Sequence, residues 1–185
     1  MKAKSGKVYI SHSGYNQSDI YFTSIQSNDF PNYNNRLIDQ VNVEGPRGYT
    51  SLDIQEIADT KYVYIVYFDE AEQSLKLARS IIDGDQFSLS TVDDSSTIIG
   101  KHPSISASDD ALYVSYYDET NQRLKIAISN DRGDNWITMF VDDSGDNVGK
   151  YSSLISDGNK VYIAYYDETN GDLKFAKSID GGKTW

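Results

Sequence analysis

The sequence of 185 residues contains no cysteine and only two histidines. Without cysteine, a disulfide framework, thiol catalysis and cysteine-ligated zinc are excluded. With His12 and His102 as the only imidazoles, a multi-histidine metal site is disfavoured as well. Basic side chains are scarce too, since 17 Lys and Arg stand against 28 Asp and Glu and give a formal net charge of −11. Binding to phosphate backbones needs a surplus of Lys and Arg, so this charge argues against nucleic acid and anionic membrane surfaces as partners.

Long apolar runs are also missing. The longest, Val63–Phe68, has the length of a β-strand and is too short to cross a bilayer. Residues 1–7 are charged and no apolar stretch follows them, so neither a signal peptide nor membrane insertion is predicted. Tyrosine, by contrast, is abundant at 15 residues, beside many Ser, Asp and Asn. Because aromatic residues favour strands and small polar residues favour tight turns, this composition predicts an all-β chain.

The chain repeats itself with a period of 49 residues. Asp69, Asp118 and Asp167 occupy equivalent places in three successive copies. Residues 100–136, laid on residues 149–185 without a gap, give 17 identities in 37 positions. The chain is therefore an array of repeats.

Each repeat reads as four short strands joined by turns. In the third unit we expect strands at 104–108, 111–117, 124–129 and 136–141. The strands show the period-two alternation of a sheet with unlike faces, and no window shows a helical stripe. Four antiparallel strands every ~40–50 residues are typical of a β-propeller blade. The expected fold is an all-β propeller segment with about 3.8 four-stranded blades, from 185 residues and the 49-residue period.

The period divides the chain into a partial blade at 1–44, blades at 45–94 and 95–143, and a blade at 144–185 that lacks its last strand. We expect the first unit to supply three strands, because the chain begins at the tail of a first strand and continues with Val8–His12 as a second strand. Propellers close with roughly 4–8 blades, and open sheet edges invite pairing with another chain. Three origins stay open: a piece of a longer protein, a ring completed by self-association, and a small ring with one incomplete blade. In solution we expect association through the open ends.

Two hairpin sequences share the pattern Ser-x-Asp-x-Gly-x-x-Trp. They are Ser129, Asp131, Gly133 and Trp136 in one repeat and Ser178, Asp180, Gly182 and Trp185 in the next, with decayed copies at 80–87 and 27–31. This pattern resembles the Asp box of sialidase-type repeat propellers. In such a turn the glycine supplies a positive φ, the aspartate accepts backbone N–H groups, and the tryptophan packs on the blade. We therefore expect a structural role for these residues.

The wider repeat resembles those of bacterial secreted and surface proteins, which implies an extracellular or cell-surface location. Sialidases resemble one another in using three arginines, a Tyr–Glu pair and an Asp acid. Here the Arg-Ile-Pro signature is missing, and Arg79 and Arg132 lie beside or inside Asp boxes, on the wrong face. The sequence thus predicts a non-enzymatic scaffold or ligand-binding module, with carbohydrate as one ligand class. A fragment of a sialidase-like glycoside hydrolase and a purely architectural array are the alternatives.

Three residues are the candidate ligand site. Tyr49, His102 and Tyr151 are equivalent in the repeat, and each lies two residues before the serine that opens a first strand. Because first strands line the channel of a propeller, these side chains should ring its mouth and offer a platform for a sugar or a small polar ligand. The alternative is that they only pack between neighbouring blades.

The loops on the same side of the propeller as Tyr49, His102 and Tyr151 are acidic. Their acidic pairs are Asp69 with Glu70, Asp93 with Asp94, Asp118 with Glu119, Asp142 with Asp143, and Asp167 with Glu168. This side could attract a basic protein partner, or the acids could serve turns and solubility. Residues 142–147 superficially resemble a calcium loop but lack its full spacing. No cofactor is expected, and calcium is the one alternative.

Overall fold

The computed structural model describes residues 1–4, 6–14, 19–26, 33–41, 48–82 and 86–185. They form the strands β1 (Lys2–Lys4), β2 (Lys7–Ser13), β3 (Ile20–Gln26), β4 (Tyr33–Asp39), β5 (Thr50–Ile57), β6 (Thr60–Asp69), β7 (Ser74–Ile81), β8 (Ser88–Asp93), β9 (Ile99–Ala107), β10 (Leu112–Asp118), β11 (Arg123–Ser129), β12 (Ile137–Phe140), β13 (Val148–Asp157), β14 (Lys160–Asp167) and β15 (Asp172–Ser178). None of the described residues belongs to a helix long and apolar enough to span a membrane. The all-β prediction is confirmed.

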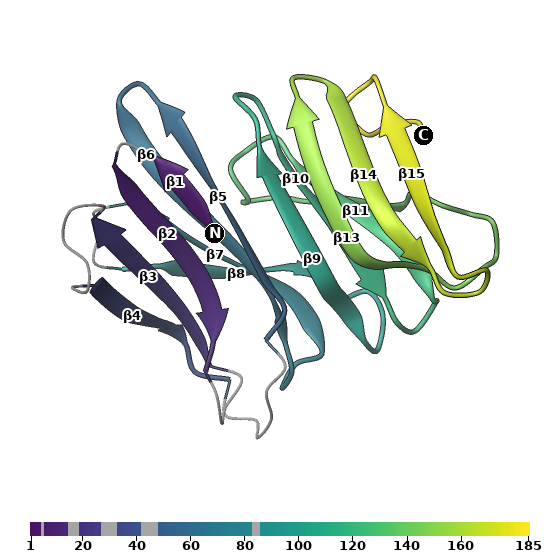
Figure 1. Cartoon of the computed structure of the whole chain (residues 1–185), viewed down its shortest axis with the longest axis horizontal. Coiled ribbons are helices and arrows are strands. Elements are labelled where there is room, and N and C mark those ends of the chain that lie inside the picture. The colour runs from purple at the N-terminus through teal and green to yellow at the C-terminus, as the bar shows by residue number, and fades with distance from the viewer. Residues whose placement is uncertain (5, 15–18, 27–32, 42–47, 83–85) are drawn as a thin grey trace.

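The strands form four antiparallel sheets in chain order (Figure 1). The first sheet has the order β1-β2-β3-β4, the second β5-β6-β7-β8, the third β9-β10-β11-β12 and the fourth β13-β14-β15. The sequence led us to expect three strands after the tail of a first strand, and that tail, Lys2–Lys4, pairs with β2 as a fourth strand. The predicted boundary between residues 44 and 45 lies outside the described residues.

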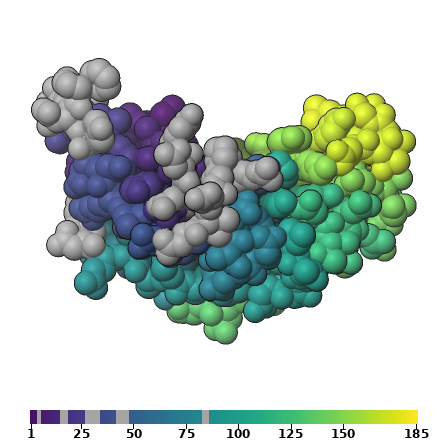
Figure 2. Space-filling model, turned by 90° about the horizontal axis from the view of Figure 1, so that it is seen from below, coloured from purple at the N-terminus to yellow at the C-terminus, as the bar shows by residue number. Residues whose placement is uncertain are grey.

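The first strands of successive sheets lie side by side. β5 contacts β9, and β9 contacts β13. Serine hydroxyls bridge these neighbours: Ser51 Oγ accepts the Ile105 N–H at 3.2 Å, and Ser104 Oγ accepts the Leu154 N–H at 3.0 Å. The sheets follow one another along an open arc, with the N-terminal and C-terminal sheets at its two ends (Figure 2).

The apolar core lies between the sheets. On β7, Leu75 and Leu77 point toward the third sheet, whereas Ala78 points toward the first. Leu124 and Ile126 on β11 repeat this arrangement against the fourth sheet. All five side chains are fully buried. Complete burial of a Leu or Ile side chain stabilises by about 1.5–3 kcal/mol, so the contact between successive sheets is a major source of stability.

A glycine lets each new sheet approach the previous one closely. Gly100 has φ +109° and Gly149 has φ +111°, conformations that other residues rarely adopt. A Cβ at position 100 would lie 2.6 Å from Leu75 Cβ, and one at position 149 would lie 2.7 Å from Leu124 Cα. No other residue fits at either place without displacing the backbone.

A carboxylate at the end of each of the first three sheets binds a tyrosine of the next; we call this contact the carboxylate clasp. The hydroxyl-to-carboxylate distances are 2.6 Å for Tyr67 and Asp39, 2.6 Å for Tyr116 and Asp93, and 2.7 Å for Tyr165 and Asp142. Lys125 adds a bond of 2.7 Å to Asp93, and Lys174 adds one of 2.5 Å to Asp142. Burial alone would raise the pKa of Asp93, but bonds from Lys125, Ser95 and Tyr116 outweigh it and lower that pKa.

The same substitution at two carboxylates of the clasp should lower the free energy of unfolding by different amounts. Lys125 and Asp93 are 7% and 3% exposed, whereas Lys174 is 31% exposed. Asp93→Asn leaves a buried ammonium without its counter-charge, so we expect it to lower the free energy of unfolding by about 3 kcal/mol. Asp142→Asn leaves a lysine that can reach water, and about 1 kcal/mol is expected. Urea unfolding measures both; equal losses would contradict this account.

Candidate functional site

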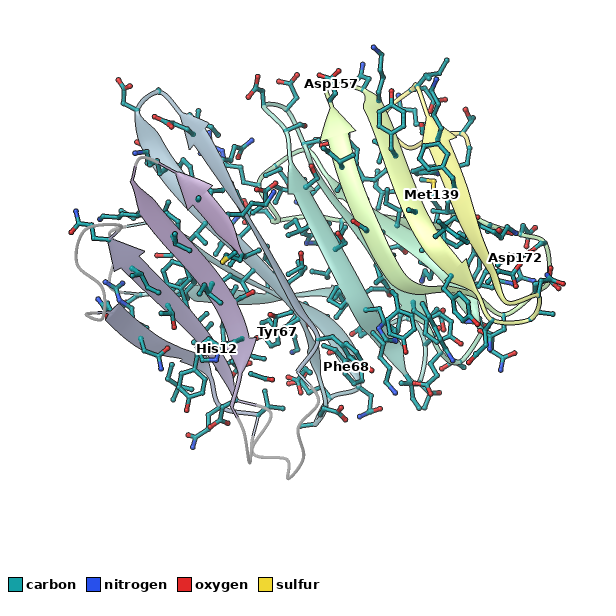
Figure 3. All side chains as sticks on the ribbon, in the orientation of Figure 1. His12, Tyr67, Phe68, Met139, Asp157 and Asp172 are labelled. Carbon is teal, nitrogen blue, oxygen red and sulfur yellow. The ribbon has the colours of Figure 1, made fainter. Side chains whose placement is uncertain are left out.

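The structure brings the three predicted site residues together. Tyr49 precedes β5, His102 lies in β9 and Tyr151 lies in β13. The His102 ring centroid is 4.2 Å from that of Tyr49 and 4.3 Å from that of Tyr151, with interplanar angles of 53° and 57°. We call these three rings the aromatic arc. The arc lies at the end of the strands where Figure 3 labels Phe68, whose N–H donates to the Tyr49 carbonyl at 3.1 Å.

Two residues of the arc have an unusual backbone. His102 has φ +51° and Tyr151 has φ +55°, in the left-handed region where residues other than glycine are uncommon. Each lies where the pairing of its strand shifts register, between β9 and β10 and between β13 and β14. Such bulges redirect a side chain and recur next to functional sites. β5 pairs with β6 without a shift, so Tyr49 reaches the arc from outside its strand.

The three rings differ in exposure, and His102 lies near two lysine–glutamate ion pairs. Tyr151 is 69% exposed, whereas Tyr49 and His102 are half-buried. Lys101 pairs with Glu119, and Lys150 pairs with Glu168. Burial, with the charges of Lys150 and Lys101 beside it, lowers the pKa of His102 to about 4. The arc therefore presents an uncharged imidazole between two phenols at neutral pH.

Two of the acids on this side are engaged within the protein. Asp118 and Asp167 are 0% and 2% exposed. Asp118 accepts bonds from the backbone and side chain of Asn121 at 3.0 and 2.8 Å, and Asp167 accepts two at 3.0 Å from Asn170. The Asn170 bonds lower the pKa of Asp167. This geometry favours turn formation over partner capture as the reason for the acidic loops.

The candidate calcium loop does not assemble a ligand set. Asp142 holds Lys174, Asp143 pairs with Arg123, and the Asp146 carboxylate lies 3.4 Å from the Asn170 amide. These oxygens have different partners. Among the residues that the structure describes, no group of three or more His, Cys, Asp or Glu could hold a metal ion. The residues present do not fit calcium.

The first Ser-x-Asp-x-Gly-x-x-Trp turn is closed by its own side chains. Ser129 Oγ donates to Asp131 Oδ1 at 2.7 Å and accepts the Gly133 N–H at 2.8 Å. Asp131 also accepts the side-chain and backbone N–H groups of Asn135, and these bonds lower its pKa to about 2. Gly133 has φ +90°. The hydrogen bonds of these side chains therefore stabilise the conformation of the turn.

The second turn repeats the first. Ser178 donates to Asp180 at 2.7 Å and accepts the Gly182 N–H at 2.9 Å, and the Trp185 indole N–H donates to the Gly182 carbonyl at 3.1 Å. A Cβ at position 182 would lie 2.7 Å from Ile128 Cδ1 of the preceding sheet. Each turn thus rests on the sheet before it. The decayed copy at 27–31 lies outside the described residues, and the one at 80–87 lies partly outside them.

Sequence reasoning missed a cavity of about 660 Å³ beside the first of these turns. Arg79 and Arg132 line it together with Tyr62 and Tyr64. Arg79 donates to the Arg132 carbonyl at 2.7 Å and to Asp134 at 2.5 Å, which joins the second sheet to the third. The only sequence signal is that the next repeat has no arginine at either of the two equivalent positions.

Comparisons with solved structures identify the fold. A Hadza microbial sialidase matches with a TM-score of 0.62 at 14% identity, over 94% of this chain and 40% of that one. An exo-β-1,3-galactanase from Clostridium thermocellum matches with 0.57 at 13% identity, over 100% and 46%. An Aleuria aurantia lectin in complex with α-methyl-L-fucoside matches with 0.55 at 14% identity, over 96% and 57%. No family model matches the chain, and no curated protein matches it.

These likenesses confirm the predicted propeller fold, with each sheet as one blade. They are too distant in sequence to show more than the fold. The chain spans less than half of the sialidase and of the galactanase.

The position of His102 predicts a pH dependence of stability. The folded pKa is lowered from 6.5 to about 4, so between these values the unfolded chain binds more protons and stability falls as the pH falls. Allowing for the half-exposed ring, we expect a loss of about 1 kcal/mol across this window. His102→Asn should flatten the window and keep the steeper loss at lower pH, where carboxylates such as Asp131 are protonated. An unchanged slope in thermal melts from pH 7 to 4 would contradict the assignment.

Alanine substitutions at Gly133 and Gly145 distinguish the cost of backbone strain from the cost of steric crowding. Their φ angles are +90° and +88°, but a Cβ at position 133 would overlap Leu77 whereas one at position 145 meets nothing within 4 Å. Gly145→Ala should lower the free energy of unfolding by about 1 kcal/mol, the cost of the left-handed backbone. Gly133→Ala should lower it by about 3 kcal/mol, because overpacking adds to that cost. Urea unfolding measures both, and similar values would rule out close packing of this turn against β7.

Proposed function

We propose that this chain is a non-enzymatic, carbohydrate-binding propeller module that acts outside the cell, with the aromatic arc as its sugar platform. The observation that carries the proposal is the close, tilted packing of the Tyr49, His102 and Tyr151 rings at one rim, with two of these residues held in a left-handed backbone. Backbone strain of this kind persists where the surroundings enforce it and clusters at binding sites.

The arc has the chemistry that a sugar needs. The apolar face of a pyranose stacks on aromatic rings, and its hydroxyls need hydrogen-bond donors and acceptors close by. The phenols of Tyr49 and Tyr151 and the uncharged imidazole of His102 supply both. The lectin and the galactanase of similar fold are named for sugar ligands or substrates, which is consistent with this use of the fold.

The engagement of the acids around the arc supports a non-enzymatic role. Glycoside hydrolysis uses two carboxyl groups about 5–10 Å apart, one of them protonated through a raised pKa. Glu119 and Glu168 are each paired with a lysine, and hydrogen bonds from Asn170 lower the pKa of Asp167, the opposite of the shift that a general acid needs. A glycosidase fragment is the second candidate function, because the chain spans only 40% of the sialidase.

The two Ser-x-Asp-x-Gly-x-x-Trp turns support assignment to the Asp-box repeats. Their matching hydrogen bonds and positive-φ glycines give each motif residue a structural task. The proposed extracellular setting rests on the resemblance of the wider repeat to those of bacterial secreted and surface proteins.

A glycan array followed by calorimetry on the strongest ligand tests the proposal. Tyr49→Ala and His102→Ala should each weaken the affinity about tenfold or more, since a hot-spot ring contributes over ~1.4 kcal/mol. Tyr62→Ala, on the Asp-box side of the chain, is the matched control and should leave the affinity unchanged. An array without binding would favour the architectural interpretation. Turnover of fluorogenic glycosides would favour the enzyme.

A further inference from the structure

The fourth sheet exposes an apolar face. Leu173 and Phe175 on β15 are 81% and 65% exposed, and Ile155 on β13 is 65% exposed. Tyr162 stacks on Phe175 at 6.1 Å on the same side of the sheet. We call these four residues the C-terminal face. Monomeric proteins rarely expose a contiguous apolar surface, which more often marks an interaction site.

The other sheets bury the equivalent positions. Leu173 and Phe175 align with Leu124 and Ile126 in the preceding repeat, and both of those are 0% exposed. They are covered by the sheet that follows them, as Leu75 and Leu77 are one repeat earlier. The C-terminal face thus has the composition of a surface that another sheet covers.

The first sheet carries the complementary surface. Val8, Ile10 and Ile25 lie on the side of the sheet opposite to Tyr9 and Phe22, which pack against the second sheet. These three side chains, the N-terminal face, are half-buried. His12, labelled in Figure 3, extends this side and stacks on Tyr21 at 5.5 Å.

The sequence of β2 shows which kind of surface the N-terminal face is, because it matches the second strands of later sheets. Val8-Tyr-Ile10 repeats as Val63-Tyr-Ile65 and Val161-Tyr-Ile163. In the later copies the two aliphatic residues are fully buried, in the clusters shared with the preceding sheet. The N-terminal face therefore has the residues that cover a preceding sheet.

We propose that copies of this chain associate head to tail, with the C-terminal face of one copy against the N-terminal face of the next. Within the chain, these two types of surface meet at all three contacts between successive sheets, and always unlike with unlike. The two sheets that carry these faces lie at opposite ends of the arc (Figure 2). Such a heterologous contact closes a ring or extends as a filament, according to the rotation between copies. It does not depend on sugar binding.

Sedimentation of two face variants tests the pairing. The unmodified chain should gain mass with concentration. Phe175→Asp and Ile10→Asp should each sediment as a monomer, because every contact in either sample contains one damaged face. An equimolar mixture should form a dimer and nothing larger, because the intact C-terminal face of one variant meets the intact N-terminal face of the other.

Leu89→Asp is the control, since Leu89 is 47% exposed on β8, away from both faces, and should keep the association. If Ile10→Asp lowers the melting temperature, Ile25→Asp reports on the same face. A monomeric parent chain at every concentration would overturn the proposal. So would association of either face variant alone, which would mean pairing of like faces or of strand edges, and so would failure of the mixture to dimerise.

Discussion

The rest of the structure depends on one contact between successive sheets. Two apolar side chains on the third strand of one sheet are buried under the next sheet. Leu75 is covered closely because Gly100 allows β9 to approach β7, and Leu77 lies against Gly133 in the turn of the next sheet. One three-stranded or four-stranded sheet has no apolar interior of its own, since each core cluster takes residues from two sheets. Stability therefore belongs to pairs of neighbours, as in other repeat proteins.

The same approach positions the aromatic arc. Gly100 and Gly149 fix the start of β9 and β13 against the preceding sheet, and the bulges that follow two residues later turn His102 and Tyr151 toward each other. The close packing of rings across the sheets thus follows from the leucine contact, although the residue types at the arc do not. The scaffold requires the two glycines; it does not require a histidine between two tyrosines. That freedom is why the arc carries the functional proposal.

Much of this architecture could be predicted because its signals are local and repeated. Strand alternation, turn residues and the 49-residue spacing all lie within short windows of sequence. The carboxylate clasp could not be predicted, because Asp93 and Tyr116 belong to different sheets and acids are common in every loop. The strand Lys2–Lys4 was expected only as the tail of a first strand, since three residues show no alternation. The cavity at Arg79 was missed because it depends on a contact with Arg132, 53 residues away.

The net charge of −11 at first suggests a surface that attracts cations. Several of the acids behind it are acceptors inside the protein: Asp118 and Asp167 close turns, and Asp93 holds a tyrosine and a lysine of the next sheet. A carboxylate that accepts two or three hydrogen bonds is stabilised in its charged form, so folding itself favours these charges. Because an engaged carboxylate has few lone pairs left for a ligand, these acids are poor candidates for recognition, which is why the proposed sugar platform consists of the rings of the arc.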